Sequence, residues 1–189
     1  DGYARATGKT GVVLATSGPG ATNLVTGIAT AYMDSIPMVA ITGNVGTSLI
    51  GRDSFQEVYI AGITMPITKH NFVVRKVDEL ADILRDAFRI AQTGRKGPVL
   101  VDIPKDVTGA TAEFTPVKPQ IPVYKTELDG QELARAAQVI GNARRPVIYF
   151  GGGVAASEAG EELYALAKKA EIPATYTMMA AGVLSYGDP

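Results

Sequence analysis

The chain has 189 residues, 46% of them hydrophobic and 20% charged, and a formal net charge of −1. This balance is typical of a soluble globular α/β protein and excludes a disordered one. The charge offers no attraction to nucleic acid or an anionic membrane, and no apolar run approaches the roughly 20 residues that span a bilayer. A cysteine-free chain has no disulfide or thiolate metal site and is typical of the cytoplasm. The single histidine, His70, argues against a catalytic triad or a His-based zinc site.

The two ends of the sequence indicate an internal fragment of a longer protein. Asp1 already lies in a helical pattern, and the chain stops at Gly187-Asp-Pro189 just after an apolar segment. A partial sheet leaves unpaired edges and uncovered apolar faces, so we expect this chain to self-associate as a symmetric dimer.

Hydrophobic periodicity predicts an α/β unit in the first part of the chain. We expect, in chain order, a strand at 11–16, a helix that ends before Pro37, a strand at 38–42, a polar loop at 43–54, a short helix at 55–60, a strand at 72–74, a helix at 78–94 and a strand at 98–103. Ser17 and Asp78 are the expected helix caps, and Gly94 the terminator of the second long helix. Strands this apolar, alternating with helices, predict a parallel sheet covered on both faces.

The composition changes after Asp106. Residues 108–130 contain Pro116, Pro119 and Pro122 with little helical periodicity, which predicts an extended linker. A second α/β unit follows, with a helix at 131–140, a strand at 146–150, a helix at 157–170 and a strand at 174–177. The predicted fold class is therefore α/β, with parallel-sheet three-layer α/β/α units.

Ser17-Gly-Pro-Gly20 follows a strand and opens a helix, a position that often binds phosphate. The last glycine is followed by Ala21-Thr-Asn23, however, without the lysine of a Walker motif, and Pro19 removes one N–H donor. The turn therefore suits a flat neutral group. A bare strand–helix turn without a ligand explains this stretch equally well.

Gly151-Gly-Gly-Val-Ala-Ala156 matches the G-x-G-x-x-A pattern of dinucleotide-binding loops. The acidic residue that would bind a ribose is missing from residues 174–179, so the pattern does not support an ordinary NAD site. A nucleotide bound in another way and a bare turn remain equal alternatives.

Residues 53–57 place Phe55 and Gln56 between two acids. Carboxylates suit the start of a helix, which explains Asp53 and Glu57, whereas the aromatic and the amide are candidates for a pocket lining. His70 is interpreted as structural or exposed. The pairing of Asp34 with Glu57 as acid and base has no support in their spacing.

Six segments occur in a characteristic order: Asp1–Gly8, Ala15–Asn23, Asp34–Gly43, Phe55–Glu57, Ile67–Asn71 and Gly97–Asp106, with Gly151–Gly153 and Ile172-Pro173 as weaker support. Taken together, they closely resemble the large catalytic subunit of the acetolactate synthase (acetohydroxyacid synthase) family of thiamine diphosphate enzymes. The resemblance covers essentially the whole chain and is most specific in the first hundred residues.

The resemblance implies a domain organisation and a ligand for the turn. Residues 1–107 would be the C-terminal part of the pyrimidine-binding domain, 108–130 a linker, and 131–189 the start of a Rossmann-like central domain associated with FAD. The turn would face the aminopyrimidine ring of thiamine diphosphate and not its phosphates.

The resemblance also implies site residues. Pro19, Gly20, Asn23 and Gln56 would contact thiamine diphosphate, with Gln56 and Phe55 lining the active site. Ser54, Phe55 and Lys69 would line the substrate channel. The residues implied to contact FAD are Arg95, Gly152, Gly153, Thr177, Met178 and Met179.

In this family, pyruvate is decarboxylated on thiamine diphosphate, and the hydroxyethyl unit is joined to a second 2-oxo acid, either pyruvate or 2-oxobutyrate. The family therefore implies a transferase of branched-chain amino acid biosynthesis that works as a homodimer or tetramer. A small regulatory subunit is a further candidate partner.

The sequence departs from the family pattern in three places. The catalytic glutamate would precede Asp1, and no Gly-Asp-Gly motif for the diphosphate and Mg²⁺ is present, so we expect this chain alone to be inactive. Gly46-Thr-Ser48 replaces the Pro-Arg-Arg of many relatives. Another thiamine diphosphate carboligase or decarboxylase, such as glyoxylate carboligase or a 2-oxo acid decarboxylase, and a non-catalytic nucleotide-binding domain are the alternatives.

Overall fold

The computed structural model describes residues 1–118, 128–185 and 187. The chain forms two compact units, 1–124 and 125–189. The helices and strands of unit 1 are α1 (Gly2–Thr7), β1 (Gly11–Ala15), α2 (Pro19–Thr22), α3 (Val25–Met33), β2 (Met38–Asn44), the 3₁₀ turn η1 (Thr47–Leu49), α4 (Ile60–Thr64), the 3₁₀ turn η2 (Met65–Ile67), β3 (His70–Val73), α5 (Val77–Gln92), β4 (Pro98–Pro104) and α6 (Lys105–Gly109).

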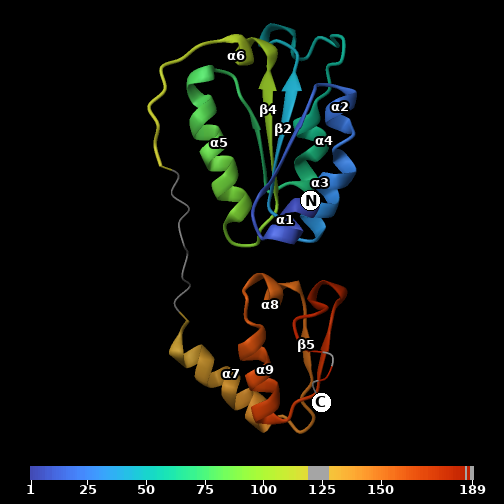
Figure 1. Ribbon diagram of the computed structural model, residues 1–189, viewed down its shortest axis with the longest axis vertical. Coiled ribbons are helices and arrows are strands. Elements are labelled where there is room, and N and C mark those ends of the chain that lie inside the picture. Colours follow the sequence, from blue (N-terminus) through green and yellow to red (C-terminus); the bar gives the residue numbers. More distant parts are fainter. Residues whose placement is uncertain (119–127, 186, 188–189) are drawn as a thin grey trace. The chain divides into compact units, whose positions relative to one another are not determined.

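Unit 1 is built on a four-stranded parallel sheet with the order β1-β2-β4-β3 (Figure 1). The central strands β2 and β4 pair along their whole length, from Met38 opposite Pro98 to Asn44 opposite Pro104. They are the most apolar and most deeply buried segments, as expected for strands covered on both faces. The parallel α/β sheet predicted for this part of the chain is confirmed.

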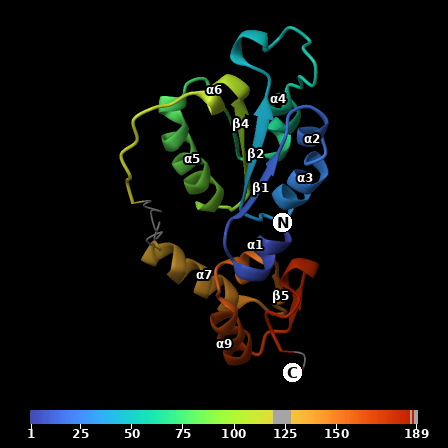
Figure 2. The ribbon, with the colours of Figure 1, turned by 45° about the horizontal axis from the view of Figure 1, so that its top comes forward.

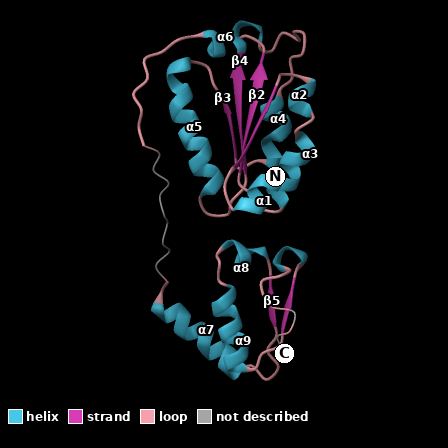
Figure 3. Ribbon diagram, in the orientation of Figure 1, coloured by secondary structure: helices cyan, strands magenta, loops and turns pink. Residues whose placement is uncertain are grey.

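Two apolar cores cover the two faces of this sheet. On one face, Ala40 and Leu100 pack with Ile28 of α3 and Ile60 of α4, and on the other, Val99 and Val101 pack against α5. Figure 3 shows α5 on one side of the strands and α2, α3 and α4 on the other. At the end of the sheet, β1 is an edge strand, and its Val12 and Leu14 are 56% and 76% exposed.

Most predicted elements of unit 1 are confirmed, but the short helix expected at 55–60 is wrong. The helix in this region is α4, which begins only at Ile60. The preceding residues form a tight loop in which Gln56 has a left-handed φ of 59°, which a helix excludes. The sequence does not predict α6, which overlaps the first two residues of the expected linker.

Two predicted helix caps are also wrong. Gly18, and not Ser17, is the N-cap of α2, and no side chain caps that helix. α5 begins at Val77 after Lys76, so Asp78 lies in the first turn, where its charge still favours the helix dipole. Gly94 has a φ of 57°, the left-handed conformation of a helix-terminating glycine, one residue after the C-cap Thr93.

Unit 2 has a two-stranded parallel sheet with short helices. Its described elements are α7 (Gly130–Asn142), β5 (Ile148–Phe150), α8 (Gly152–Ala156), α9 (Gly160–Ala170), β6 (Ala174–Tyr176) and the 3₁₀ turn η3 (Met178–Ala180). The Phe150 ring lies 5.8 Å from the Tyr176 ring. Several large apolar side chains of the described part are exposed, among them Val147, Tyr149 and Met178.

The linker prediction is tested in part. Residues 110–118 have no regular structure, and the ring of Phe114 lies 5.8 Å from the Arg85 guanidinium of α5. Pro119 and Pro122 lie outside the described residues, and the domain limits at 107 and 130 stay predictions. Among the described helices, none is both long and apolar enough to cross a membrane.

The central strand β4 and the edge strand β1 predict different costs for the same substitution. Leu100→Ala should lower the free energy of unfolding by about 2–5 kcal/mol, because Leu100 is fully buried in β4. Leu14→Ala on the exposed face of β1 should change it by less than about 0.5 kcal/mol. Urea unfolding of the two variants measures both values, and equal losses would contradict the assigned core.

Candidate functional site

The four parallel strands of unit 1 all end at one edge of the sheet, here called the carboxyl edge. Since the strands are parallel, the segments that follow β1, β2 and β4 all leave from this edge. They are the Gly18 turn (residues 16–20), the Gln56 segment (residues 44–57) and α6. Figure 2 shows the connection after β2 extending beyond the strand ends. The carboxyl ends of parallel strands are where α/β sheets bind ligands.

The Gly18 turn and the Gln56 segment are in close contact through their backbones. A Cβ placed on Gly18 would lie 2.7 Å from the Gln56 carbonyl oxygen, and Gly18 itself has a φ of 59°. A Cβ on Gly43 of β2 would lie 3.4 Å from the Ser17 nitrogen. At position 18 only glycine allows this approach, whereas the distance at Gly43 is that of an ordinary contact. The fold thus brings the sequence-predicted turn and Gln56 together.

The sequence-predicted side chains at this contact, those of Asn23, Phe55 and Gln56, are uncharged. Pro19 begins α2 and Asn23 is its C-cap, and both are exposed, one turn apart. The Phe55 side chain is 89% exposed, and Gln56 is exposed beside it. The Gly18 turn itself carries no cation. Amides, an aromatic ring and backbone carbonyls suit a flat ring with hydrogen-bonding edges, and not a phosphate.

Two carboxylates tie the start of the Gln56 segment to the carboxyl edge, and a third closes its other half. Buried Asp102 of β4 accepts hydrogen bonds from Thr42 Oγ1 at 2.7 Å and Asn44 Nδ2 at 2.5 Å. Exposed Asp106 of α6 accepts from the backbone nitrogen and the hydroxyl of Thr47, at 3.0 and 2.5 Å. Sequence reasoning missed Asp102 and Asp106 because only the fold shows which loop each one reaches.

The third carboxylate, Glu57, accepts hydrogen bonds from the backbone nitrogens of Gly51 and Ser54, the latter at 2.8 Å. The helix-start role expected for it is therefore wrong. These bonds, that from Ser54 first, lower the pKa of Glu57, so it is ionised at neutral pH. Asp34 forms an ion pair with Arg5 at 2.5 Å and does not pair with Glu57, in agreement with the sequence analysis.

Lys69 and Arg95 lie at the opposite, amino-terminal edge of the sheet. Lys69 directly precedes β3, and its Nζ donates to the carbonyls of Ile90 and Thr93 at the end of α5, the latter at 2.6 Å. Burial lowers the pKa of Lys69. Arg95 donates to Ser35 Oγ at 2.7 Å, just beyond α3. Neither lies near Gln56 within unit 1, whereas Ser54 and Phe55 adjoin it.

In unit 2, the glycines at the start of α8 meet the residues after β6. A Cβ on Gly151 would lie 3.3 Å from Thr177 Oγ1, and one on Gly152 would lie 3.1 Å from Met179 Cβ. Thr177 donates its backbone N–H to the Phe150 carbonyl at 2.9 Å. The sequence-predicted Gly152, Gly153, Thr177, Met178 and Met179 thus form one cluster at the ends of β5 and β6.

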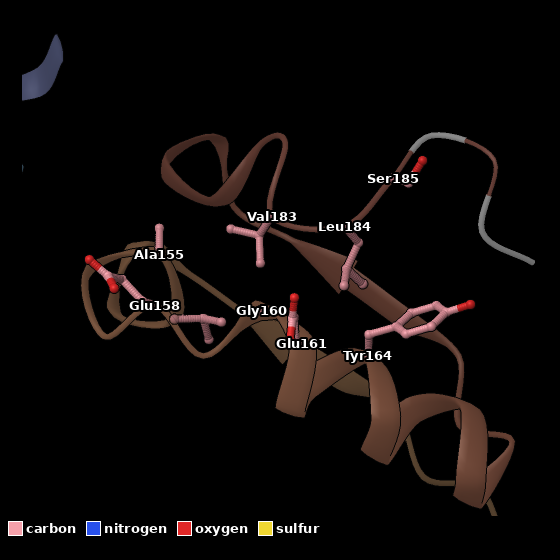
Figure 4. Close-up of a pocket in the computed structure, with 9 residues that line it drawn as sticks. Ala155, Glu158, Gly160, Glu161, Tyr164, Val183, Leu184 and Ser185 are labelled. Carbon is pink, nitrogen blue, oxygen red and sulfur yellow. The ribbon is translucent and has the colours of Figure 1, made fainter. Parts of the chain in front are cut away.

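A separate cavity of about 730 Å³ opens beside this cluster (Figure 4). Val154 and Ala155 of α8, Tyr164 of α9 and Val183 line it, and Glu161 points into it. A carboxylate in the wall makes it a poor site for an anion. The described residues contain no group of three or more His, Cys, Asp or Glu side chains that would hold a metal ion.

His70 is exposed on the edge strand β3, where its ring meets that of Phe72 edge-on at 4.4 Å. This agrees with a structural or exposed role.

Comparison with known proteins identifies both units. Residues 1–63 match the family described as "Thiamine pyrophosphate enzyme, N-terminal TPP binding domain", and residues 133–189 match "Thiamine pyrophosphate enzyme, central domain". The chain is 56% identical over 184 residues to a Mycobacterium leprae protein named "Acetolactate synthase" and 53% identical over 184 residues to "Acetolactate synthase large subunit" of Corynebacterium glutamicum. It is 50% identical over 195 residues to "Probable acetolactate synthase large subunit" of Methanocaldococcus jannaschii.

These matches cover 96–100% of this chain but only 29–33% of each relative. The chain therefore spans about a third of the length of the curated relatives it matches.

Gly18→Ala tests the contact between the Gly18 turn and Gln56. The new Cβ would meet the Gln56 carbonyl in a left-handed backbone, so we expect a loss of about 1–3 kcal/mol in the free energy of unfolding. Gly27→Ala is the matched control, since a Cβ there meets nothing within 4 Å in helix α3 and should be neutral or stabilising. Urea unfolding compares them, and equal effects would contradict the contact.

The buried carboxylate of Asp102 predicts a pH dependence. Burial raises its pKa above the ordinary 3.8, against the lowering effect of its bonds to Thr42 and Asn44. The folded state therefore binds this proton more tightly than the unfolded state. The contribution of the protonated Asp102 to the free energy of unfolding is complete below pH about 3.8 and is lost as the pH rises through the raised pKa. The free energy of unfolding of wild type minus that of Asp102→Asn should fall across this window in urea titrations. A difference that is independent of pH would contradict this.

Proposed function

The chain belongs to the thiamine pyrophosphate enzymes, and we propose that it is part of the large subunit of an acetolactate synthase, a transferase. The observation that carries this proposal is an identity of 50–56% along 96–100% of the chain to proteins of that name. The uncharged side chains of Asn23, Phe55 and Gln56 at the carboxyl edge of unit 1 support it.

We propose that the Gly18 turn and Gln56 receive the aminopyrimidine ring of thiamine diphosphate. The chemistry of the available groups fits this ring: Asn23 and Gln56 offer amides, Phe55 offers an apolar surface, and the Gly18 turn carries no cation. When bound, the cofactor supplies the electron sink that decarboxylation of a 2-oxo acid requires. Pro19 and Gly20 fix the shape of the turn beside it.

The residues of this chain would then orient the cofactor and shape the approach to it. The exposed Phe55 ring excludes water from one side of the approach, and the Gln56 amide can bind a carbonyl or carboxylate oxygen of a 2-oxo acid. Pyruvate and a second 2-oxo acid, in branched-chain amino acid biosynthesis, are the proposed substrates. We place Mg²⁺ and the diphosphate groups outside this chain, as the resemblance implies.

We propose that the cluster of unit 2 contacts FAD. Gly153 leaves open space where a Cβ would stand, and Thr177 offers a hydroxyl beside the 87% exposed Met178. A glycine loop, a hydroxyl and flexible apolar side chains fit a dinucleotide without requiring an acid for the ribose. Arg95 of unit 1 is the remaining proposed FAD contact.

The experiment that tests this function is acetolactate formation from pyruvate. The polypeptide that the whole gene encodes, which includes this chain, is assayed with thiamine diphosphate, Mg²⁺ and FAD. Each of the three is then omitted in turn. We expect acetolactate formation to require thiamine diphosphate. We also expect bound FAD to give a flavin absorbance that turnover does not bleach. The 189-residue chain alone is the control and should form no acetolactate.

Two outcomes would contradict the proposal. Thiamine-dependent consumption of glyoxylate, or aldehyde release from another 2-oxo acid in place of acetolactate, would indicate a different carboligase or decarboxylase. Saturable binding of an adenine nucleotide with no response to thiamine diphosphate would indicate a nucleotide-binding module.

A further inference from the structure

The Gln56 segment has little regular structure of its own. Between β2 and α4, only the 3₁₀ turn η1 is regular, yet this segment carries Phe55 and Gln56. Its path is fixed near its start by Asp102 and Asp106, through Asn44 and Thr47. The half that carries Gln56 therefore needs an anchor of its own.

Glu57 is the anchor of that half. Its two carboxylate oxygens accept hydrogen bonds from different backbone nitrogens, Oε1 from Gly51 and Oε2 from Ser54, while its own nitrogen donates to the Ser54 carbonyl at 2.9 Å. One side chain thus closes the loop 51–57 on itself. Hydrogen bonds to a charged group are about twice as strong as neutral ones.

The closed loop contains unfavourable backbone conformations that need such support. Asp53 and Gln56 have φ values of 53° and 59°, although neither is glycine, and Gly51 has a φ of 80°. Left-handed conformations of this kind persist only where surrounding interactions hold them. The hydrogen bond between Gly51 and Glu57 spans both Asp53 and Gln56, and the bond between Ser54 and Glu57 spans Gln56 and ends beside Asp53.

The backbone of Gln56 in turn contacts the Gly18 turn. Because a Cβ on Gly18 would lie 2.7 Å from the Gln56 carbonyl, the two backbones are already at contact distance. A displacement of Gln56 must therefore shift the turn or open a gap beside it. The position of Gln56 relative to the turn depends on the loop that Glu57 closes.

We propose that Glu57 is a positioning residue, which holds Gln56 against the Gly18 turn by closing the loop 51–57 without itself contacting cofactor or substrate. This inference rests on the proposed function for its kinetic consequence, but the anchoring itself is tested without activity. Its chemistry is specific to a carboxylate, because a carboxamide offers one accepting oxygen where the loop supplies two N–H donors.

Glu57→Gln in the polypeptide that contains this chain is the test, and Asp53→Asn is its matched control. Asp53 lies in the same loop and loses the same charge, and asparagine tolerates its left-handed φ. Hydrogen exchange followed by mass spectrometry of peptides covering 50–58 and 16–22 measures the anchoring. We expect faster exchange in both peptides for Glu57→Gln and no change for Asp53→Asn.

The kinetic readout is the concentration of thiamine diphosphate that gives half-maximal activation. Loss of one charge-assisted hydrogen bond predicts a rise of about ten-fold for Glu57→Gln, with a smaller fall in kcat at saturating cofactor. Asp53→Asn should match wild type. A merely structural role would lower the amount of active enzyme and leave this concentration unchanged.

The outcomes separate this inference from the proposed function. Exchange in Glu57→Gln equal to that in Asp53→Asn overturns the anchoring, whatever the enzyme does. Faster exchange with an unchanged activation concentration overturns the positioning role while acetolactate formation still supports the function. If wild type forms no acetolactate, the proposed function fails, and exchange in the 16–22 peptide still decides whether Glu57 holds Gln56 against the turn.

Discussion

The contact between the backbones of Gly18 and Gln56 is the constraint on which the carboxyl edge of unit 1 depends. It joins a turn that follows β1 to a loop that follows β2, although the two are almost forty residues apart in sequence. The contact is possible only because β1 and β2 are parallel neighbours, so that both chains leave the sheet at the same edge. Glycine at position 18 provides both the left-handed backbone and the missing Cβ that this approach needs.

Three carboxylates, those of Asp102, Asp106 and Glu57, accept the hydrogen bonds that hold the segments at this edge. Asp102 is buried, which disfavours its ionised form, whereas Asp106 and Glu57 are stabilised as anions by the N–H and hydroxyl groups that they accept from. The buried member ties the two central strands together through Thr42, and the outer two hold the loop beyond them. The hydrogen bonds of these three carboxylates therefore run from the buried strands to the loop that carries Gln56, at the proposed cofactor site.

The sequence predicts the parts of this fold in which one physical signal dominates. Continuous apolar runs identify β2 and β4, and the spacing of Leu80, Ile83, Leu84 and Phe88 identifies α5, because burial decides those segments. The helix predicted at 55–60 is wrong, since the local pattern cannot show that the Glu57 carboxylate binds the nitrogens of Gly51 and Ser54. Residue type alone also misplaces a cap: Ser17 is a good cap by type, but Gly18 is the N-cap, so the helix starts one residue later.

The placement of Lys69 limits how the proposed substrate channel can be built. Its backbone nitrogen bonds the carbonyl of Pro98, where β4 begins, whereas Ser54 and Phe55 lie beyond the opposite end of the strands. From Pro98 to Pro104, an extended strand covers about 20 Å, which is several times the reach of a lysine side chain. A single copy of unit 1 therefore cannot present all three residues to one channel. Within one copy of unit 1, the structure therefore does not bring Lys69 to the same channel as Phe55, as the resemblance implied. A second copy that places its amino-terminal edge beside the carboxyl edge of the first would bring them together, so the proposals of a shared channel and of a homodimer depend on each other.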